Sequence, residues 1–298
     1  MRRLLGAFLL LLLPFAALAF SGSIVDAAFV EKARKRGAII WDIRAASGYD
    51  LGHIPGAISI GFIADALLDS KTQQLLPIEV IAARLGEAGI DLNREIVVYG
   101  GVPGISYPYF AQFALEYFGA RRVHVFHQGI EGWKAAKKPV STLAATRKSV
   151  KVRPFANPAL LATTGEVLAR VGSADVQFVD VRSLPEFTGE QSETLNGGHI
   201  PGAIHIPSIQ NVVDPDAMRR IMAMETIDTS GLALKNRAAL KRLYAALDPR
   251  KETIVYCHTG IRASMTAAVL AQLGFHSVRV YHASWLEYGN LADAPLER

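Results

Sequence analysis

The chain contains an internal repeat. The string Gly-His-Ile-Pro-Gly-Ala occurs unchanged at residues 52–57 and 198–203. Each copy follows an apolar run that ends in Asp-x-Arg, at residues 38–44 and 176–182, and precedes a β-branched run, at residues 95–99 and 252–256. Because the motifs keep the same order in both halves, and 298 residues can form two cores, we expect two domains of one fold.

Short apolar runs alternate with longer segments in each half. Residues 38–43, 96–99 and 123–126 have the length of strands, whereas residues 78–88 and 108–118 have the length of helices. Strands separated by helices are typical of right-handed crossover units. We therefore predict an α/β fold in which each domain is a mostly parallel sheet with helices on both faces.

The boundary between the two domains is expected in residues 137–157, where prolines and a Ser/Thr/Ala cluster break any regular period. We place it near Lys148. This division predicts a first domain at residues 20–147 and a second domain at residues 148–298.

The first 19 residues have the pattern of a signal peptide. They begin with Met-Arg-Arg, continue with an apolar stretch, and end in Ala-Leu-Ala at residues 17–19. This pattern predicts cleavage before Phe20 and a periplasmic or secreted protein. The alternative is an uncleaved membrane anchor, but the apolar run is shorter than the ~20 residues that span a bilayer. No later segment has the length and apolarity of a span, so we expect no membrane span after cleavage.

The charge pattern argues against nucleic acid as a partner. The formal net charge of +5 includes Arg2 and Arg3, which would leave with the signal peptide. No Lys/Arg block and no interleaving of aromatic and basic residues is present in the sequence.

Cys257 is the only cysteine. Exported proteins commonly gain stability from disulfides, but one cysteine cannot form an internal bridge. Cys257 is therefore either a buried, inert side chain or a reactive thiol. It follows a predicted strand, and residues 264–273 are predicted to form the next helix. The intervening loop thus lies where open α/β sheets bind ligands, which favours a reactive thiol.

The loop after the cysteine reads His258-Thr259-Gly260-Ile261-Arg262. A tight strand-to-helix loop directs backbone N–H groups inward, at the positive end of the helix, and this favours a thiolate. Gly260 can adopt a positive φ. Arg262 adds a permanent cation where the helix dipole disfavours one, so we expect an anionic thiolate or substrate beside it. His258 could contact substrate or point outward, and Thr259 could donate a hydrogen bond or only fill the loop.

The Asp-x-Arg ends, the repeated turn, the cysteine loop and the closing Ala-Ser-Trp-Leu-Glu-Tyr at residues 283–288 together resemble the rhodanese family. The resemblance covers nearly all of the chain after residue 19, in tandem. It implies a sulfurtransferase that carries a sulfane sulfur as a persulfide on Cys257, without a metal or other cofactor. The implied partners are a small anionic donor, with thiosulfate expected first and 3-mercaptopyruvate second, and a cyanide, thiol or protein acceptor.

The first copy of the loop, residues 99–106, has Gly100 in place of the cysteine and no arginine. It resembles the inactive amino-terminal domain of tandem rhodaneses, so we expect it to close one wall of the active cleft. Asp180 and Arg182 are expected to form an internal ion pair or to brace a loop, with a catalytic contact left open. Members that use thiosulfate or 3-mercaptopyruvate carry a second arginine just after Asp-x-Arg. Glu186 stands there in this chain, which leaves the donor open.

Three other functions compete with the sulfurtransferase. The first is a persulfide carrier that serves a partner protein. The second is a cysteine-dependent phosphatase, but such enzymes have a Cys-x-x-x-x-x-Arg loop, and only four residues separate Cys257 from Arg262. The third is a structural domain whose cysteine is incidental.

Overall fold

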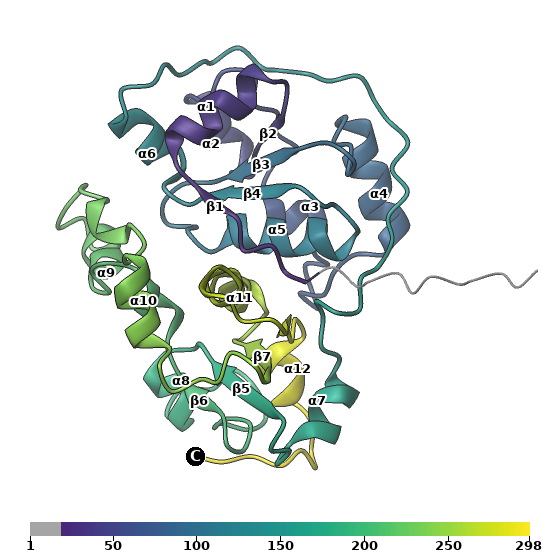
Figure 1. Ribbon diagram of the computed structural model, residues 1–298, viewed down its shortest axis with the longest axis vertical. Helices are drawn as coiled ribbons and strands as arrows, with labels where there is room; N and C mark the ends of the chain where they lie inside the picture. Colours follow the sequence, from purple (N-terminus) through teal and green to yellow (C-terminus); the bar gives the residue numbers. More distant parts are fainter. Residues whose placement is uncertain (1–18) are drawn as a thin grey trace, which may run out of the picture.

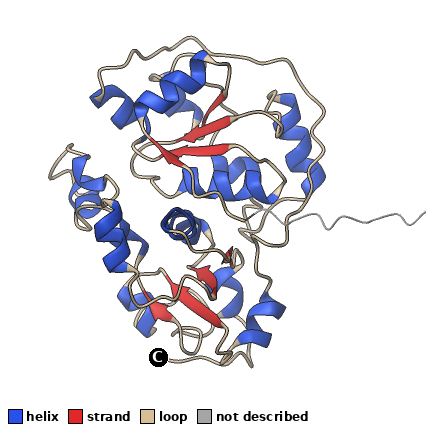
Figure 2. Ribbon diagram, in the orientation of Figure 1, coloured by secondary structure: helices blue, strands red, loops and turns tan. Residues whose placement is uncertain are grey.

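The computed structural model describes residues 19–298, which form two α/β domains with one parallel sheet each (Figure 1; Figure 2). This confirms the predicted fold class. Except for its last residue, the predicted signal peptide lies outside the described residues. No helix within residues 19–298 combines the length and apolarity needed to cross a membrane.

The sheet of the first domain has the strand order β1-β4-β3-β2, with every neighbouring pair parallel. The elements are β1 (Ile24–Val25), α1 (Ala27–Lys35), β2 (Ile39–Asp42), α2 (Ala46–Asp50), α3 (Ile63–Leu67), α4 (Ile78–Glu87), β3 (Ile96–Tyr99), α5 (Tyr107–Tyr117), β4 (Val123–Phe126) and α6 (Gly129–Ala135). Every residue of β2 and β3 is buried, because α1 and α6 cover one face of the sheet and α3 to α5 the other.

The sheet of the second domain has the order β6-β5-β7-β8 and is also parallel. Its elements are α7 (Thr164–Arg170), β5 (Val176–Asp180), α8 (Leu184–Thr188), β6 (Ile204–His205), η1 (Ser208–Asn211), α9 (Ala217–Met222), η2 (Ser230–Leu232), α10 (Arg237–Leu243), β7 (Glu252–Tyr256), α11 (Ile261–Leu273), β8 (Val278–Val280) and α12 (Ser284–Tyr288). Helices α7 and α12 pack on one face, and α10 and α11 on the other.

Helices α5 and α11 join the two domains. Figure 1 shows α11 between the two sheets, and a single apolar core contains side chains from both helices. The ring of His282, which follows β8, stacks on Phe110 of α5 at a centroid distance of 5.5 Å and lies tilted against Phe113 at 6.1 Å. The helix that follows the cysteine loop is thus covered by the first domain.

The connection between the domains stays on the first domain beyond Lys148, the boundary expected from the sequence. The N–H of Val150 donates to the carbonyl of Gly86 (2.9 Å), and the N–H of Asn157 donates to that of Tyr117 (2.7 Å). Hydrogen bonding to the second domain begins at Pro158, whose carbonyl accepts from Arg279 Nη2 (3.3 Å), and continues at Leu160, whose carbonyl accepts from the N–H of Val280 (2.8 Å). The chain therefore crosses directly after Asn157.

Candidate active site

Cys257 lies directly after β7, and α11 begins at Ile261, three residues before the predicted helix start at residue 264. Gly260 makes the early start possible, because its φ of +80° turns the chain sharply into the helix. A Cβ at this position would lie 2.8 Å from the carbonyl oxygen of His282, so no larger residue fits. The N–H of Gly260 donates to the Cys257 Sγ (3.1 Å), and Cys257 is only 1% exposed.

The loop backbone is held by the start of α12. The N–H of Cys257 donates to the Ser284 Oγ (3.1 Å), and its carbonyl accepts from the N–H of Trp285 (3.0 Å). The carbonyl of His258 accepts from the N–H of Leu286 (2.9 Å). These three bonds give the closing motif at residues 283–288 a role that the sequence did not reveal, which is to fix the cysteine loop in position.

The first domain repeats this geometry without the chemistry. The carbonyl of Gly100 accepts from the N–H of Ile130 (3.0 Å), as that of Cys257 does from Trp285. Gly129 stands where Ser284 stands in the second domain, and both have a left-handed backbone, with φ values of +59° and +52°. A serine in the left-handed region is uncommon. The replacement of a glycine in the first repeat by Ser284 in the second was therefore the one sequence feature that could have indicated the role of Ser284 in the loop.

Asp180 and Arg182 form a buried internal ion pair. The Nε and Nη2 of Arg182 donate to the Asp180 carboxylate at 2.6–3.0 Å, and Nη2 also donates to the carbonyl of Gly198 (2.6 Å). The Arg182 guanidinium lies 4.3 Å from the centre of the Trp285 ring. Arg182 thus ties the turn at residues 198–203 to the loop support, which is the bracing role expected from the sequence.

The structure places Arg262 in the first turn of α11, with its guanidinium on Glu186. Its Nη1 donates to Glu186 Oε2 (2.8 Å) and its Nη2 to Oε1 (2.7 Å). Burial alone would raise the pKa of Glu186, but the hydrogen bonds and charge of Arg262, with those from Ser183, lower it to about 2. The pair is therefore intact at neutral pH. The sequence identified both residues but gave no sign that they would neutralise each other.

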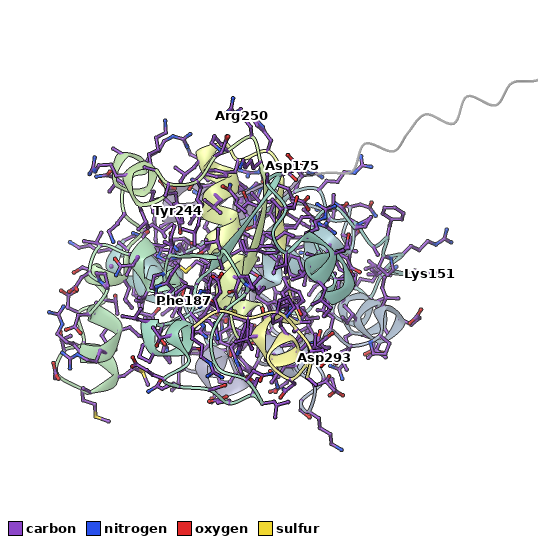
Figure 3. All side chains as sticks on the ribbon, turned by 90° about the horizontal axis from the view of Figure 1, so that it is seen from below. Lys151, Asp175, Phe187, Tyr244, Arg250 and Asp293 are labelled. Carbon is purple, nitrogen blue, oxygen red and sulfur yellow. The ribbon has the colours of Figure 1, made fainter. Side chains whose placement is uncertain are left out.

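Helix α8 also positions Phe187, the residue after Glu186, which is labelled in Figure 3. This ring stacks on His199 of the repeated turn at a centroid distance of 3.7 Å, and His199 Nδ1 lies 3.0 Å from the Phe187 carbonyl. In the first domain, Tyr49 stacks on His53 at the same distance. The repeated histidines therefore serve the packing of the turn in both copies.

His258 turns toward an acidic side chain. Its Nε2 lies 3.4 Å from Glu193 Oε2, and the Glu193 side chain is 86% exposed. Burial lowers the pKa of His258 below its usual value, so the ring is neutral at neutral pH. We therefore do not count His258 as a second cation of the site.

Two cavities meet at Arg262. One of about 400 Å³ lies between the domains and is lined by residues 103–107 of the first domain and by Thr259, Ile261 and Arg262 of the second. This supports the expectation that the first domain forms one wall. The other, of about 240 Å³, is polar and is lined by Arg182, Glu186, Gln191, Ser192, Glu193, His258, Arg262 and Trp285.

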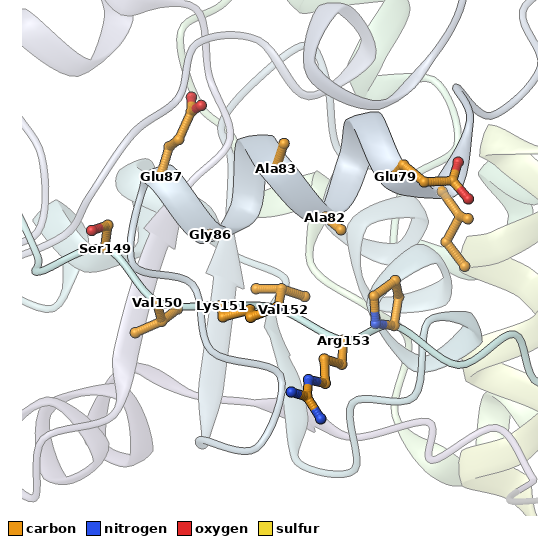
Figure 4. A pocket seen from close by; sticks show the side chains of 12 residues that line it. Glu79, Ala82, Ala83, Gly86, Glu87, Ser149, Val150, Lys151, Val152 and Arg153 are labelled. Carbon is orange, nitrogen blue, oxygen red and sulfur yellow. The ribbon is translucent and has the colours of Figure 1, made fainter.

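A larger cavity of about 630 Å³ lies elsewhere, between α4 and residues 149–154 (Figure 4). Glu79, Glu87, Lys151 and Arg153 are its charged lining residues, and none of the cysteine-loop residues lines it. This cavity is therefore separate from the site around Cys257, although it is larger than the two cavities at Arg262.

Comparison with known proteins identifies the family and the fold. The family model described as a rhodanese-like domain matches residues 26–136 and 163–291. A thiosulfate sulfurtransferase of Corynebacterium glutamicum is 33% identical over 261 residues, which cover 84% of this chain and 81% of that protein.

Two solved structures share the fold. SseA from Escherichia coli, described as a 3-mercaptopyruvate sulfotransferase with the rhodanese fold, matches with a TM-score of 0.73 and 24% identity, over 90% of this chain and 99% of that one. The anaerobic ergothioneine biosynthesis enzyme from Chlorobium limicola, solved with trimethyl histidine, matches with a TM-score of 0.78 and 24% identity, over 93% and 70% of the two chains.

Proposed function

Because this chain belongs to the rhodanese family and is a sulfurtransferase, we propose that it transfers a sulfane sulfur through a persulfide on Cys257. The sulfur would come from a small anionic donor, with thiosulfate as the first to test, and would leave to cyanide, a thiol or a protein. The observation that carries this proposal is the position of the only cysteine. It lies between a parallel strand and the start of α11, with the Gly260 N–H directed at its sulfur.

The proposed reaction needs no general base once the thiolate is present. The Cys257 thiolate attacks the outer sulfur of the donor and forms a new S–S bond. The donor's own S–S bond breaks, and its electron pair leaves on sulfite when the donor is thiosulfate. The Gly260 N–H and the positive end of the 13-residue α11 stabilise the negative charge, first on the thiolate and then on the persulfide.

Intact mass spectrometry after incubation with thiosulfate tests this proposal. We expect a gain of one sulfur atom per chain, and its loss when cyanide is added, with thiocyanate as the product. Because no second cysteine can resolve the persulfide internally, the gain should persist without an acceptor. Repeated turnover with cyanide would indicate an enzyme that acts on free acceptors. Loading without turnover would indicate a persulfide carrier instead.

We also propose that the protein is exported and that its mature amino terminus is Phe20, after Ala-Leu-Ala at residues 17–19. Phe20 is buried and stacks on Phe113 at a centroid distance of 6.5 Å, and the N–H of Ser21 donates to Glu116 Oε2 (3.1 Å). The packed part of the chain thus includes the residue after the predicted cleavage site. Terminal sequencing of the exported protein should begin at or near Phe20. A retained Met1 would contradict cleavage.

A further inference from the structure

We propose that the sulfur donor is an organic molecule with one negative charge, whose body occupies the cleft between the domains. Glu186 sets this charge preference by neutralising Arg262. This inference rests on the proposed persulfide chemistry of Cys257, and it narrows the class of donor. Three features of the structure carry it: the fixed position of Glu186, the charge balance around the polar cavity, and the apolar lining of the cleft.

The Glu186 carboxylate is fixed from two sides. Arg262 holds both of its oxygens, and Oε2 also accepts from the N–H (2.9 Å) and the Oγ–H (2.8 Å) of Ser183. The side chains of Arg262 and Glu186 are 35% and 23% exposed, so solvent screens this pair less than it would screen a surface pair. An incoming anion therefore meets an arginine whose two terminal nitrogens already donate to a carboxylate.

The polar cavity has no surplus of positive charge in the described part of the chain. Its cations are Arg182, which is paired with Asp180, and Arg262, which is paired with Glu186. Glu193 adds a further carboxylate, and His258 beside it is neutral at neutral pH. The charges of these two ion pairs and of Glu193 therefore sum to one negative charge. A dianion such as thiosulfate is thus less favoured here than a donor with one negative charge.

The cleft between the domains suits an organic body. Its volume of about 400 Å³ lies within the range of about 300–1,000 Å³ that is typical of sites for small organic ligands. Arg262 is its only charged lining residue among those the structure describes. Beside the hydroxyl groups of three serines and one threonine, apolar and aromatic side chains from both domains line it: Ile105, Tyr107, Val181, Ile209, Met218 and Met265. Burial of a hydrocarbon group here would favour donors larger than an inorganic anion.

Organic thiosulfonates provide matched probes of this inference. In benzenethiosulfonate, the Cys257 thiolate would form the new S–S bond to the outer sulfur, and benzenesulfinate would leave with the electron pair of the broken bond. The donor carries one negative charge and an apolar ring. Methanethiosulfonate keeps the charge but has a smaller body, whereas thiosulfate has two charges and no organic body.

The experiment measures kcat/KM for the three donors with cyanide as acceptor, and the persulfide by intact mass. Each value is divided by the rate at which the same donor reacts with free cysteine, which removes differences in leaving-group reactivity. We expect the corrected kcat/KM to be about tenfold higher for benzenethiosulfonate than for methanethiosulfonate, as burial of part of a ring would give. Equal corrected values would overturn the role of the cleft.

The variant Glu186→Gln tests the role of charge, because glutamine keeps the shape and removes the negative charge beside Arg262. We expect kcat/KM to rise about tenfold for thiosulfate and about threefold for benzenethiosulfonate. Removal of the Glu186 charge relieves repulsion in proportion to the charge of the donor, so the free energy gained by a dianion is about twice that gained by a monoanion. The matched control is Glu87→Gln, which removes an exposed carboxylate that lines the separate cavity of about 630 Å³ and not the site around Arg262. It should change either value by less than about twofold.

The outcomes separate the inference from the function on which it rests. If no donor adds sulfur to Cys257, the proposed function fails. If all donors load Cys257 but Glu186→Gln leaves the ratio of thiosulfate to benzenethiosulfonate unchanged, the function stands and the role of Glu186 is overturned. Should the glutamine variant unfold, Glu186→Ala provides the second test, with the same expected direction.

Discussion

Cys257→Ser is expected to abolish sulfur loading completely while leaving the fold intact. A serine hydroxyl is not appreciably ionised at neutral pH and cannot hold a sulfane sulfur, and the chain has no other cysteine to replace it. The substitution is nearly the same size, and the hydroxyl oxygen can still accept the N–H of Gly260. Intact mass after incubation with thiosulfate should therefore show no added sulfur, and the thermal unfolding midpoint should stay within a few degrees of the parent.

The matched control for this variant is Gly100→Ala, at the equivalent place in the first domain. A Cβ at Gly100 would lie 3.3 Å from the nearest side-chain atom, Cγ of Pro108, which is a close contact rather than an overlap. This variant should load sulfur at the parental rate. Sulfur retained by Cys257→Ser would show a second acceptor in the protein, and the assignment of Cys257 would then be wrong.

Arg262→Ala is expected to lower kcat/KM with thiosulfate by about 10- to 150-fold. A hydrogen bond to a charged group contributes about 1.5–3 kcal/mol, which corresponds to this range. The structure adds a second cause, because the substitution leaves the Glu186 carboxylate without its cation and close to the path of an anionic donor. Arg262→Lys should recover only part of the activity, since an ammonium keeps the charge but cannot donate to both carboxylate oxygens in the same planar geometry.

A double variant separates the two causes. If the unpaired Glu186 carboxylate contributes to the loss, Arg262→Ala combined with Glu186→Gln should be more active with thiosulfate than Arg262→Ala alone. The rate of alkylation of Cys257 by iodoacetamide at neutral pH should fall in the alanine variant and fall less in the lysine variant. Parental rates of alkylation and sulfur transfer in both single variants would show that Arg262 has no part in the site.

The architecture could be predicted from the sequence, because repetition and periodicity are local properties. The repeated turn, the buried strands and the segments of helical length predicted two α/β domains with parallel sheets, and the order of motifs predicted which residues follow a strand. The same local order placed Cys257 between a strand and a helix, where parallel sheets bind ligands. Helix ends were less well predicted. Gly260 starts α11 three residues early, which moved Arg262 from the loop into the helix.

Which side chains meet depends on how segments that are far apart in the sequence pack together. Glu186 and Arg262 are 76 residues apart, and their hydrogen bonds depend on how α8 and α11 lie across the second sheet. The bond between the Cys257 N–H and Ser284 likewise depends on packing, because it links the ends of two neighbouring strands. The cleft at Arg262 is lined by residues of both domains, so it exists only when they are packed together. A sequence pattern gives the kind and order of charged residues. Which of them pair depends on how segments far apart in the sequence pack together. In this chain, the pairing of Arg262 with Glu186 determines the charge that a donor meets.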